Sequence, residues 1–146
     1  MRINAFADVC LRTLMLLGAR AGEQLTSREI SERIGVPYNH VSKAVLELRR
    51  RGALEVARGR SGGARITAAG LALNVGGLLR ALDGHQDPVE CIAVDGTTCP
   101  LLAGCQLRTA LQQAREAFYA TLDGITIDSL TGHPSLARLP FPRLPG

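Results

Sequence analysis

Three cysteines in the second half of the chain are the residues best suited to chemistry. Cys91, Cys99 and Cys105 lie within 15 residues, in a segment that also contains glycine and proline. Structural zinc sites usually take their cysteines in close C-x2-C pairs. Here seven and then five residues separate the cysteines, so no close pair is present. Wider spacings suit an iron–sulfur cluster, whose iron corners lie apart, and the loop is predicted to bind one.

A cluster held by three cysteines leaves one iron without a thiolate, and the chain offers three candidate ligands for it: Asp8, Cys10 and His85. Two of them also have a plainer interpretation. Asp8 and Arg12 stand four residues apart, as in a surface ion pair on a helix. Cys10 lies among apolar residues at helical spacing and is expected to be a small buried side chain. The spacing alone leaves the fourth ligand open.

Basic residues are concentrated in the middle of the chain. All 146 residues together carry 17 basic and 13 acidic side chains, a net charge of +4. The segment 28–65 holds nine basic residues against four acidic ones, whereas 83–95 holds four acidic residues and no Lys or Arg. A basic segment of this kind is typical of a surface that binds a polyanion such as DNA.

Local signals predict that this basic segment forms a helix-turn-helix. Apolar residues at helical spacing predict a first helix over 2–20. Thr26 and Glu29 form a capping box that opens a second helix, which stops at Gly35. A third helix is expected over 37–51. Two short helices joined by a tight turn, the second of them basic at its far end, are typical of this motif.

A β-hairpin is expected directly after the third helix. Residues 54–58 and 64–67 alternate like strands, and the turn between them is rich in glycine and arginine, which predicts a wing. The exposed start of the third helix is expected to read base edges in the major groove. Those candidate residues are Tyr38, Asn39, His40, Ser42 and Lys43. The candidates for contacts to phosphates or the minor groove are Arg28, Arg49, Arg58, Gly59, Arg60 and Arg65.

Plainer interpretations remain for some of these side chains. His40 can equally be solvated, and the run Arg49–Arg51 can be a solvated helix end that complements the helix dipole.

The rest of the chain is expected to form further helices and a tail. Asn74 can cap a helix over 75–83, and a long helix over 105–123 is apolar on two faces, which predicts a contact with a partner subunit. The predicted fold class is mainly α with a small β-hairpin wing, a winged helix-turn-helix plus a long C-terminal dimerisation helix. Four units are expected: the DNA-binding domain 1–84, the cluster-binding loop 85–104, the dimerisation helix with a short helix 105–130, and a disordered tail 131–146. Disorder is expected in the tail because it holds four of the seven prolines.

Four segments together resemble the iron–sulfur winged-helix repressor family. They are V-P-Y-N-H at the start of the third helix, the wing A-R-G-R-S-G-G, the segment V-G-G-L-L-R-A-L-D-G and the three-cysteine loop. The resemblance covers about residues 1–130 in order. Family members that regulate cluster biogenesis have a histidine ligand three residues after the last cysteine, where this chain has Arg108. The opening M-R-I-N-A-F-A-D instead resembles the nitric-oxide-sensing repressors of the family.

The resemblance implies a cofactor, a partner and a signal. The cofactor is a 4Fe–4S cluster, with a 2Fe–2S cluster as an alternative or degradation form. Its ligands would be Cys91, Cys99 and Cys105, with Asp8 of the partner subunit at the fourth iron of a homodimer. The homodimer would repress transcription by binding an inverted-repeat operator in double-stranded DNA. Nitric oxide would nitrosylate the cluster and release the operator.

Other functions remain open at this point. An iron–sulfur regulator that senses redox or cluster status, and a zinc or thiol-redox DNA-binding regulator, are the alternatives. An electron-transfer protein would explain the cysteines but not the basic wing. We find no nucleophile–base constellation or phosphate loop, so an enzyme is not expected.

The sequence also predicts the compartment. The longest uncharged stretch is the 14 residues 66–79, shorter than the ~20 of a membrane-spanning helix. The first residues lack the apolar core of a signal peptide. A cytoplasmic protein with reduced cysteines and no membrane contact is therefore expected.

Overall fold

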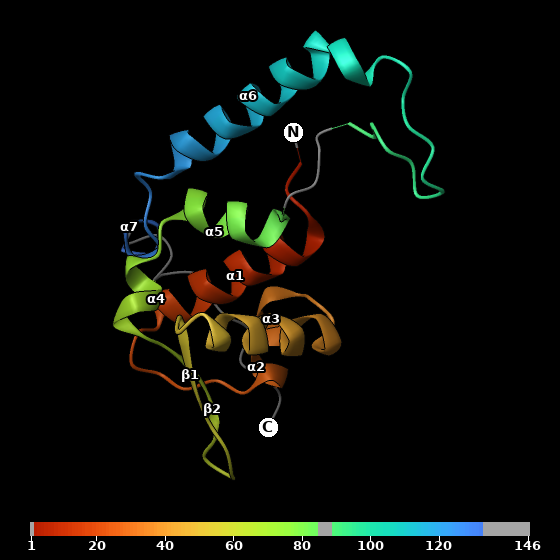
Figure 1. Ribbon diagram of the computed structural model, residues 1–146. Helices are drawn as coiled ribbons and strands as arrows, with labels where there is room; N and C mark the ends of the chain where they lie inside the picture. Colours follow the sequence, from red (N-terminus) through yellow and green to blue (C-terminus); the bar gives the residue numbers. More distant parts are fainter. Residues whose placement is uncertain (1, 85–88, 133–146) are drawn as a thin grey trace.

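The helix α1 (Ala5–Ala19) lies at the centre of the fold. The computed structural model describes residues 2–84 and 89–132. Figure 1 shows the elements stacked in the order α6, α5, α1, α3 and the wing. In chain order they are α1, α2 (Ser27–Ile34), α3 (Tyr38–Arg50), β1 (Leu54–Ala57), β2 (Gly63–Ile66), α4 (Ala68–Ala72), α5 (Val75–Asp83), the 3-10 helix η1 (Leu102–Gly104), α6 (Gln106–Leu122) and α7 (Ile127–Thr131).

The core forms where α1 packs against α3. Leu14 and Leu17 of α1 and Val41 and Leu48 of α3 are completely buried. Burying one such side chain contributes about 1.5–3 kcal/mol. The helix predicted over 2–20 is confirmed, but it begins at Ala5 because the Asn4 side chain caps it, accepting a hydrogen bond from the N–H of Ala7.

The predicted helix-turn-helix is confirmed together with its capping box. The N–H of Thr26 donates to Glu29 Oε2 (2.8 Å), and the N–H of Glu29 donates to Thr26 Oγ1 (3.2 Å). Gly35 ends α2 with a φ of +67°, a left-handed conformation that favours glycine. α3 begins at Tyr38, one residue later than expected, because Pro37 has extended backbone and serves as the N-cap.

The wing is an antiparallel hairpin anchored by the segment before α2. β1 pairs with β2 so that Leu54 lies opposite Ile66. Leu25 and Ala64 exchange two backbone hydrogen bonds, of 3.0 and 2.7 Å. A Cβ at Gly63 would lie 2.8 Å from the Leu25 backbone. Glycine at the base of the wing is therefore required by packing within the chain itself.

The short helix α4 was not predicted. It has five residues and no apolar periodicity that would reveal it, and it is opened by Thr67, whose Oγ1 accepts a hydrogen bond from the N–H of Gly70 (2.9 Å). The next helix, α5, confirms the expected cap: Asn74 Oδ1 accepts from the N–H of Gly77 (2.6 Å).

The helix α6 extends away from the body of the protein. After it the chain returns beside residues 73–75, at the start of α5. The N–H of Val75 donates to the carbonyl of Ile125 (2.8 Å), and the N–H of Ile127 donates to the carbonyl of Leu73 (3.0 Å). α7 then packs against α1, with Ile127 completely buried. Part of the segment 105–130 thus belongs to the same core as 1–84.

The C-terminal helix runs one residue further than expected. The predicted disordered tail 131–146 is wrong at its start, because Thr131 is the last residue of α7 and is buried. The remaining residues of that prediction, 133–146, lie outside the described residues.

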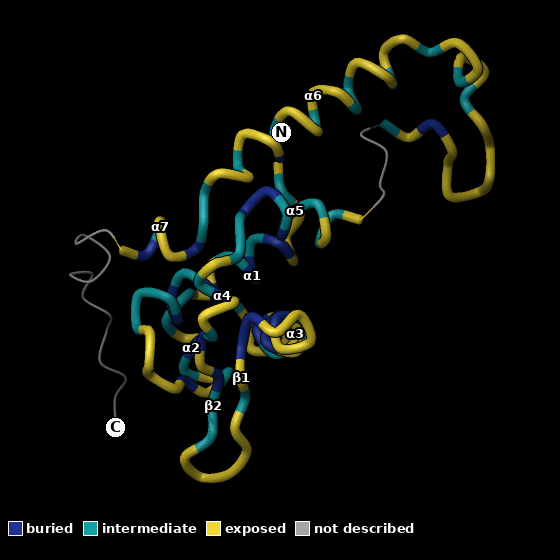
Figure 2. Tube along the Cα trace, turned by 60° about the vertical axis from the view of Figure 1, so that its left-hand side comes forward, coloured by how far each residue is buried: buried dark blue, intermediate teal, exposed yellow. Residues whose placement is uncertain are grey.

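Most of α6 is exposed, as Figure 2 shows. Of its described side chains only that of Tyr119 is fully buried. Phe118 and Leu122 pack at the edge of the core, whereas Leu107 is 62% exposed and Ala110 and Ala114 are exposed. The chain itself therefore leaves much of the predicted apolar surface of this helix uncovered. Among the described residues, no helix is long and apolar enough to span a membrane.

Arg80 of α5 holds the base of α6 in place. Its guanidinium binds Glu116 and Asp123, each at 2.7 Å, and lies 5.4 Å from the centroid of the Tyr119 ring. The Tyr119 hydroxyl donates to Asp83, and burial together with this bond raises the pKa of Tyr119 to about 12. The two helices are close enough that a Cβ at Gly76 would overlap the backbone carbonyl of Tyr119.

We expect Gly76→Ala to destabilise the protein by about 1–3 kcal/mol, because the added methyl group forces α5 and α6 apart. Urea unfolding followed by circular dichroism measures the change. The matched control is Gly124→Ala, whose methyl group would meet no atom within 4 Å. Equal stability of the two variants would contradict the close packing.

Candidate functional site

The exposed side of α3 presents a row of side chains opposite the core. Val41 and Leu48 point inward and are completely buried, and in Figure 2 the outer side of α3 is exposed. Four exposed side chains follow one another at intervals of four, three and four residues, which places them on one face of a helix. This row, which we call the outer row of α3, consists of Asn39, Lys43, Leu46 and Arg50.

The predicted base-reading residues occupy different positions relative to the outer row. Asn39 and Lys43 belong to it, and Tyr38 and His40 are exposed beside its start. Ser42 is half-buried, and its Oγ is covered without a hydrogen-bond partner, so its hydroxyl does not point to the exposed side.

Sequence reasoning did not single out Leu46, and it named Arg50 only as part of the run Arg49–Arg51. Their spacing from Asn39 was the signal that could have identified them. Arg50 also pairs with Glu47 (2.8 Å), and the hydrogen bond from Arg50 is the main reason that the pKa of Glu47 is lowered.

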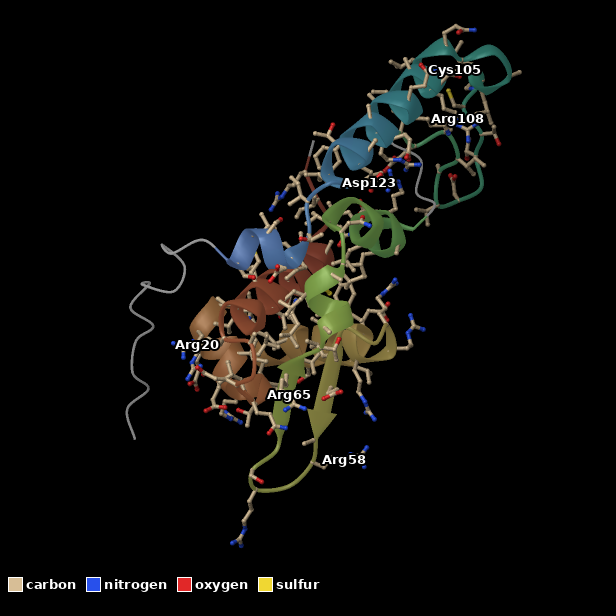
Figure 3. The ribbon with its side chains drawn as sticks, turned by 90° about the vertical axis from the view of Figure 1, so that its left-hand side faces the viewer. Arg20, Arg58, Arg65, Cys105, Arg108 and Asp123 are labelled. Carbon is tan, nitrogen blue, oxygen red and sulfur yellow. The ribbon has the colours of Figure 1, made fainter. Side chains whose placement is uncertain are left out.

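The arginines of the wing differ in their surroundings. Arg58 and Arg60 are exposed at the end of the hairpin, and Figure 3 shows Arg58 near its tip and Arg65 closer to the body. Arg65 pairs with Glu55 at 2.8 Å, which partly neutralises its charge. Gly59 has a φ of +107° and opens the turn. The wing thus offers two arginine charges for phosphates beyond the paired one.

An open hollow of about 500 Å³ lies where α2, α3 and the wing meet. The Arg28 guanidinium lies 5.6 Å from the centroid of the Tyr38 ring, which joins the starts of the two helices. The hollow is lined by Thr26, Ser27, Arg28, Tyr38, Val56, Ala57, Gly59, Gly62 and Gly63. A basic side chain beside exposed wing backbone suits a DNA phosphate.

Cys91 and Cys99 lie at the two ends of a small hairpin. The N–H of Cys99 donates to the carbonyl of Cys91 (2.9 Å), and the N–H of Ala93 donates to the carbonyl of Thr97 (2.9 Å). At the turn, Asp95 Oδ1 accepts a hydrogen bond from the N–H of Thr97 (2.9 Å). The seven-residue gap therefore brings two cysteines together. The Asp-Gly pair at positions 95–96 was the sequence signal that could have predicted this hairpin.

Cys105 is the N-cap of α6. Its Sγ accepts a hydrogen bond from the backbone N–H of Arg108 (3.4 Å), and Figure 3 shows both residues at the outer end of the helix. A turn and then η1 lead from the second cysteine to the third. The N–H of Leu102 closes this turn by donating a hydrogen bond to the carbonyl of Cys99 (3.0 Å). Amide donors to sulfur stabilise thiolate charge and tune the potential of a cluster.

The cysteine loop fits an iron–sulfur cluster in its donor set. Within residues 2–84 and 89–132 no three His, Cys, Asp or Glu side chains are already grouped to hold a metal ion. The three thiols nevertheless lie in one short loop, with Cys91 buried and Cys99 and Cys105 half-buried, and one sulfur has an amide donor. Sulfur ligands with amide donors are what iron–sulfur clusters require.

The candidates for a fourth ligand have different surroundings. Cys10 is completely buried in the core, as expected, and burial, assisted by the charge of Glu47, raises the pKa of its thiol to about 12. Cys10 is therefore a core side chain. Asp8 is half-exposed in the first turn of α1 and forms an ion pair with Arg12 at 2.9 Å. His85 lies outside the described residues.

A helix-turn-helix with an exposed polar and basic row, followed by an arginine-bearing wing, defines a winged-helix DNA-binding regulator. A family model named Rrf2 and described as an iron-dependent transcriptional regulator matches residues 3–133. The chain belongs to the Rrf2 family of transcriptional regulators.

Curated relatives are similar along nearly the whole chain. The transcriptional repressor NsrR of Streptomyces coelicolor is 43% identical over 137 residues, which is 92% of this chain and 91% of the relative. The regulator NsrR of Geobacillus kaustophilus is 36% identical over 141 residues, 95% of this chain and 96% of the relative. The chain is therefore a transcriptional repressor related to NsrR and not an enzyme.

Solved structures share the fold. CymR of Bacillus subtilis has a TM-score of 0.66 at 22% identity and covers 90% of this chain and 97% of its own. IscR of T. potens has a TM-score of 0.67 at 17% identity and covers 90% of this chain and 87% of its own. These likenesses confirm the predicted fold class, mainly helical with a β-hairpin wing.

Arg60→Ala is expected to weaken binding to all DNA sequences and to lower the slope of log K against log salt by about one unit, because one phosphate contact is lost. Fluorescence anisotropy with a labelled duplex over a series of salt concentrations measures the slope. Arg65→Ala is the matched control, and its effect should be smaller because Glu55 already pairs with Arg65. An unchanged slope with an altered base preference would show that Arg60 reads the groove instead.

Proposed function

We propose that this chain is a homodimeric iron–sulfur repressor that releases operator DNA in response to nitric oxide. The observation that carries the proposal is the loop in which Cys91 and Cys99 pair through their backbones and Cys105 caps α6. The family description as iron-dependent supports iron as the metal. Nitric oxide as the signal rests on the resemblance of residues 1–8 to the nitric-oxide-sensing repressors.

In this proposal Cys91, Cys99 and Cys105 hold three irons of a 4Fe–4S cluster, and Asp8 of the partner subunit holds the fourth. When bound, the cluster would offer one iron whose protein ligand is a carboxylate. A carboxylate is replaced by a diatomic molecule more easily than a thiolate is. Figures 1 and 2 show the cysteine loop at the outer end of α6, away from α1 of the same chain. This separation supports a carboxylate from the partner.

A second copy of the chain is the proposed cover for α6. Leu107, Ala110 and Ala114 are exposed on this helix, and Leu101 beside it is 72% exposed. Covering such side chains is favourable at about 25 cal/mol per Å² of apolar surface. A two-fold dimer would place two wings and two α3 helices on DNA, so an inverted repeat with half-sites about one helical turn, or a multiple of it, apart is expected.

The helix α1 would connect the cysteine loop of one subunit to the DNA-binding face of the other. Asp8 lies on the exposed side of its first turn, and the opposite side packs directly against α3. Arg12 is the alternative partner of Asp8 on the same helix. Asp8 therefore has two competing sets of contacts, and a shift between them would tilt α1 and with it α3.

A thiol-redox regulator is the second candidate, and the adjacency of Cys91 and Cys99 favours it. Native mass spectrometry of protein isolated without oxygen separates the two functions. The proposal expects a dimer with four irons and four sulfides per chain. A zinc-loaded or iron-free protein with a disulfide would overturn it.

The three loop cysteines are expected to act as a unit. Replacing Cys91, Cys99 or Cys105 by serine should give colourless protein, because each thiolate holds one iron, whereas Cys10→Ser should keep the colour. Iron and sulfide content and visible absorption of anaerobic protein measure the outcome. A brown, fully loaded Cys99→Ser variant would contradict the assignment.

Asp8→Ala is expected to assemble a cluster on three cysteines but to bind operator DNA at nearly the level of the cluster-free protein, because α1 has lost its contact with the partner's loop. Anaerobic binding measurements on fully loaded proteins test this. The matched control is Arg12→Ala, which removes the competing exposed pair, worth about 0.3–0.5 kcal/mol, and leaves Asp8 free for the partner's loop, so DNA binding by the loaded protein should not fall. Normal binding by Asp8→Ala, with loss in His85→Ala, would transfer the ligand role to His85.

A further inference from the structure

Leu46 is an apolar side chain in the middle of a polar and basic row. Its side chain is 64% exposed on the outer row of α3. Lys43 precedes it by three residues and Arg50 follows it by four, so both lie next to it on the helix surface.

Leu46 is separate from the other exposed aliphatic side chains of the described residues. Those belong to the cysteine loop and the start of α6, where the proposed second copy would cover them; they are Ile92, Val94, Leu101 and Leu107. Leu46 lies instead on α3, whose buried side packs against α1. A contact between subunits through the cysteine loop and α6 would therefore leave Leu46 uncovered.

The major groove of DNA offers one apolar group on a base edge, the 5-methyl group of thymine. A leucine in the groove can bury this methyl group while lysine and arginine on either side contact phosphates or guanine edges. Asn39, one helical turn before Lys43 in the same row, has the amide that pairs with adenine. The outer row thus combines one amide, two cations and one apolar side chain.

We propose that Leu46 packs against the 5-methyl group of a thymine in each operator half-site and is a specificity-determining residue of the repressor. This inference rests on the proposed function, in which the outer row of α3 enters the major groove. It predicts a preference for thymine over both cytosine and uracil at one symmetric pair of positions.

Removal of the thymine methyl group is the direct test. The probe is an inverted-repeat duplex enriched from a random pool by the wild-type dimer under anaerobic conditions. Deoxyuridine then replaces thymidine at one symmetric pair of positions at a time, which keeps base pairing and every hydrogen-bonding group. At one such pair of positions, deoxyuridine should weaken wild-type binding about fourfold per half-site, or about 15-fold for the dimer. This is the effect expected when each half-site loses one buried methyl group.

Leu46→Ala should bind the thymine and uracil duplexes equally. Because Leu46 is exposed, the variant should keep its thermal unfolding midpoint. The readout is the ratio of thymine to uracil affinity within each protein, so that a general loss of affinity in Leu46→Ala does not count in favour of the inference. If the replacement by deoxyuridine changes the affinity of the wild type and of Leu46→Ala equally at every position, the inference is overturned while the repressor function stands. If the protein enriches no sequence at all, both proposals are overturned.

Discussion

The packing of α1 against α3 is the contact on which the rest of the structure depends. Leu14 and Leu17 on one side, and Val41 and Leu48 on the other, are completely covered. The interior of a protein is close-packed, so two helices joined in this way move as one body. The outer row of α3 therefore has no independent orientation, because it is fixed by the helix that also carries Asp8.

Ion pairs and hydrogen bonds hold the base of α6 against α5 and the start of α1. Arg80 binds two carboxylates of α6, and Asp83 accepts hydrogen bonds from both Tyr119 and the Asn4 side chain. Because Asn4 also caps α1, the end of α5, the last turn of α6 and the start of α1 meet at one carboxylate. The last turn of α6 is thus connected to the start of α1 through polar groups, in addition to the apolar packing of Phe118 and Leu122 against the core.

Elements with strong local signals were predictable from the sequence, and those formed by contacts distant along the chain were not. The caps at Thr26 and Asn74 depend on a polar side chain at a fixed offset from the helix, so sequence alone predicted them. By contrast, α4 is too short to show a period, and the return of Ile127 to the core depends on backbone pairing 50 residues apart. The cysteine spacing predicted an iron–sulfur site, which stays a prediction. The backbone pairing there had a sequence signal in the Asp-Gly pair at positions 95–96 but was not predicted, whereas the covered hydroxyl of Ser42 could be known only from the fold.

The backbone pairing of residues 73–75 with 125–127 has a consequence for how such proteins diversify. The segment between these two stretches, which includes α5, the cysteine loop and α6, leaves and re-enters the body at one point. Its outer loop can therefore gain or lose residues at little cost, because the entropic cost of closing a loop grows only slowly with its length. Neither the core nor the outer row of α3 has to adjust. Selection can therefore change the residues of the loop while the body that carries the winged helix-turn-helix stays the same.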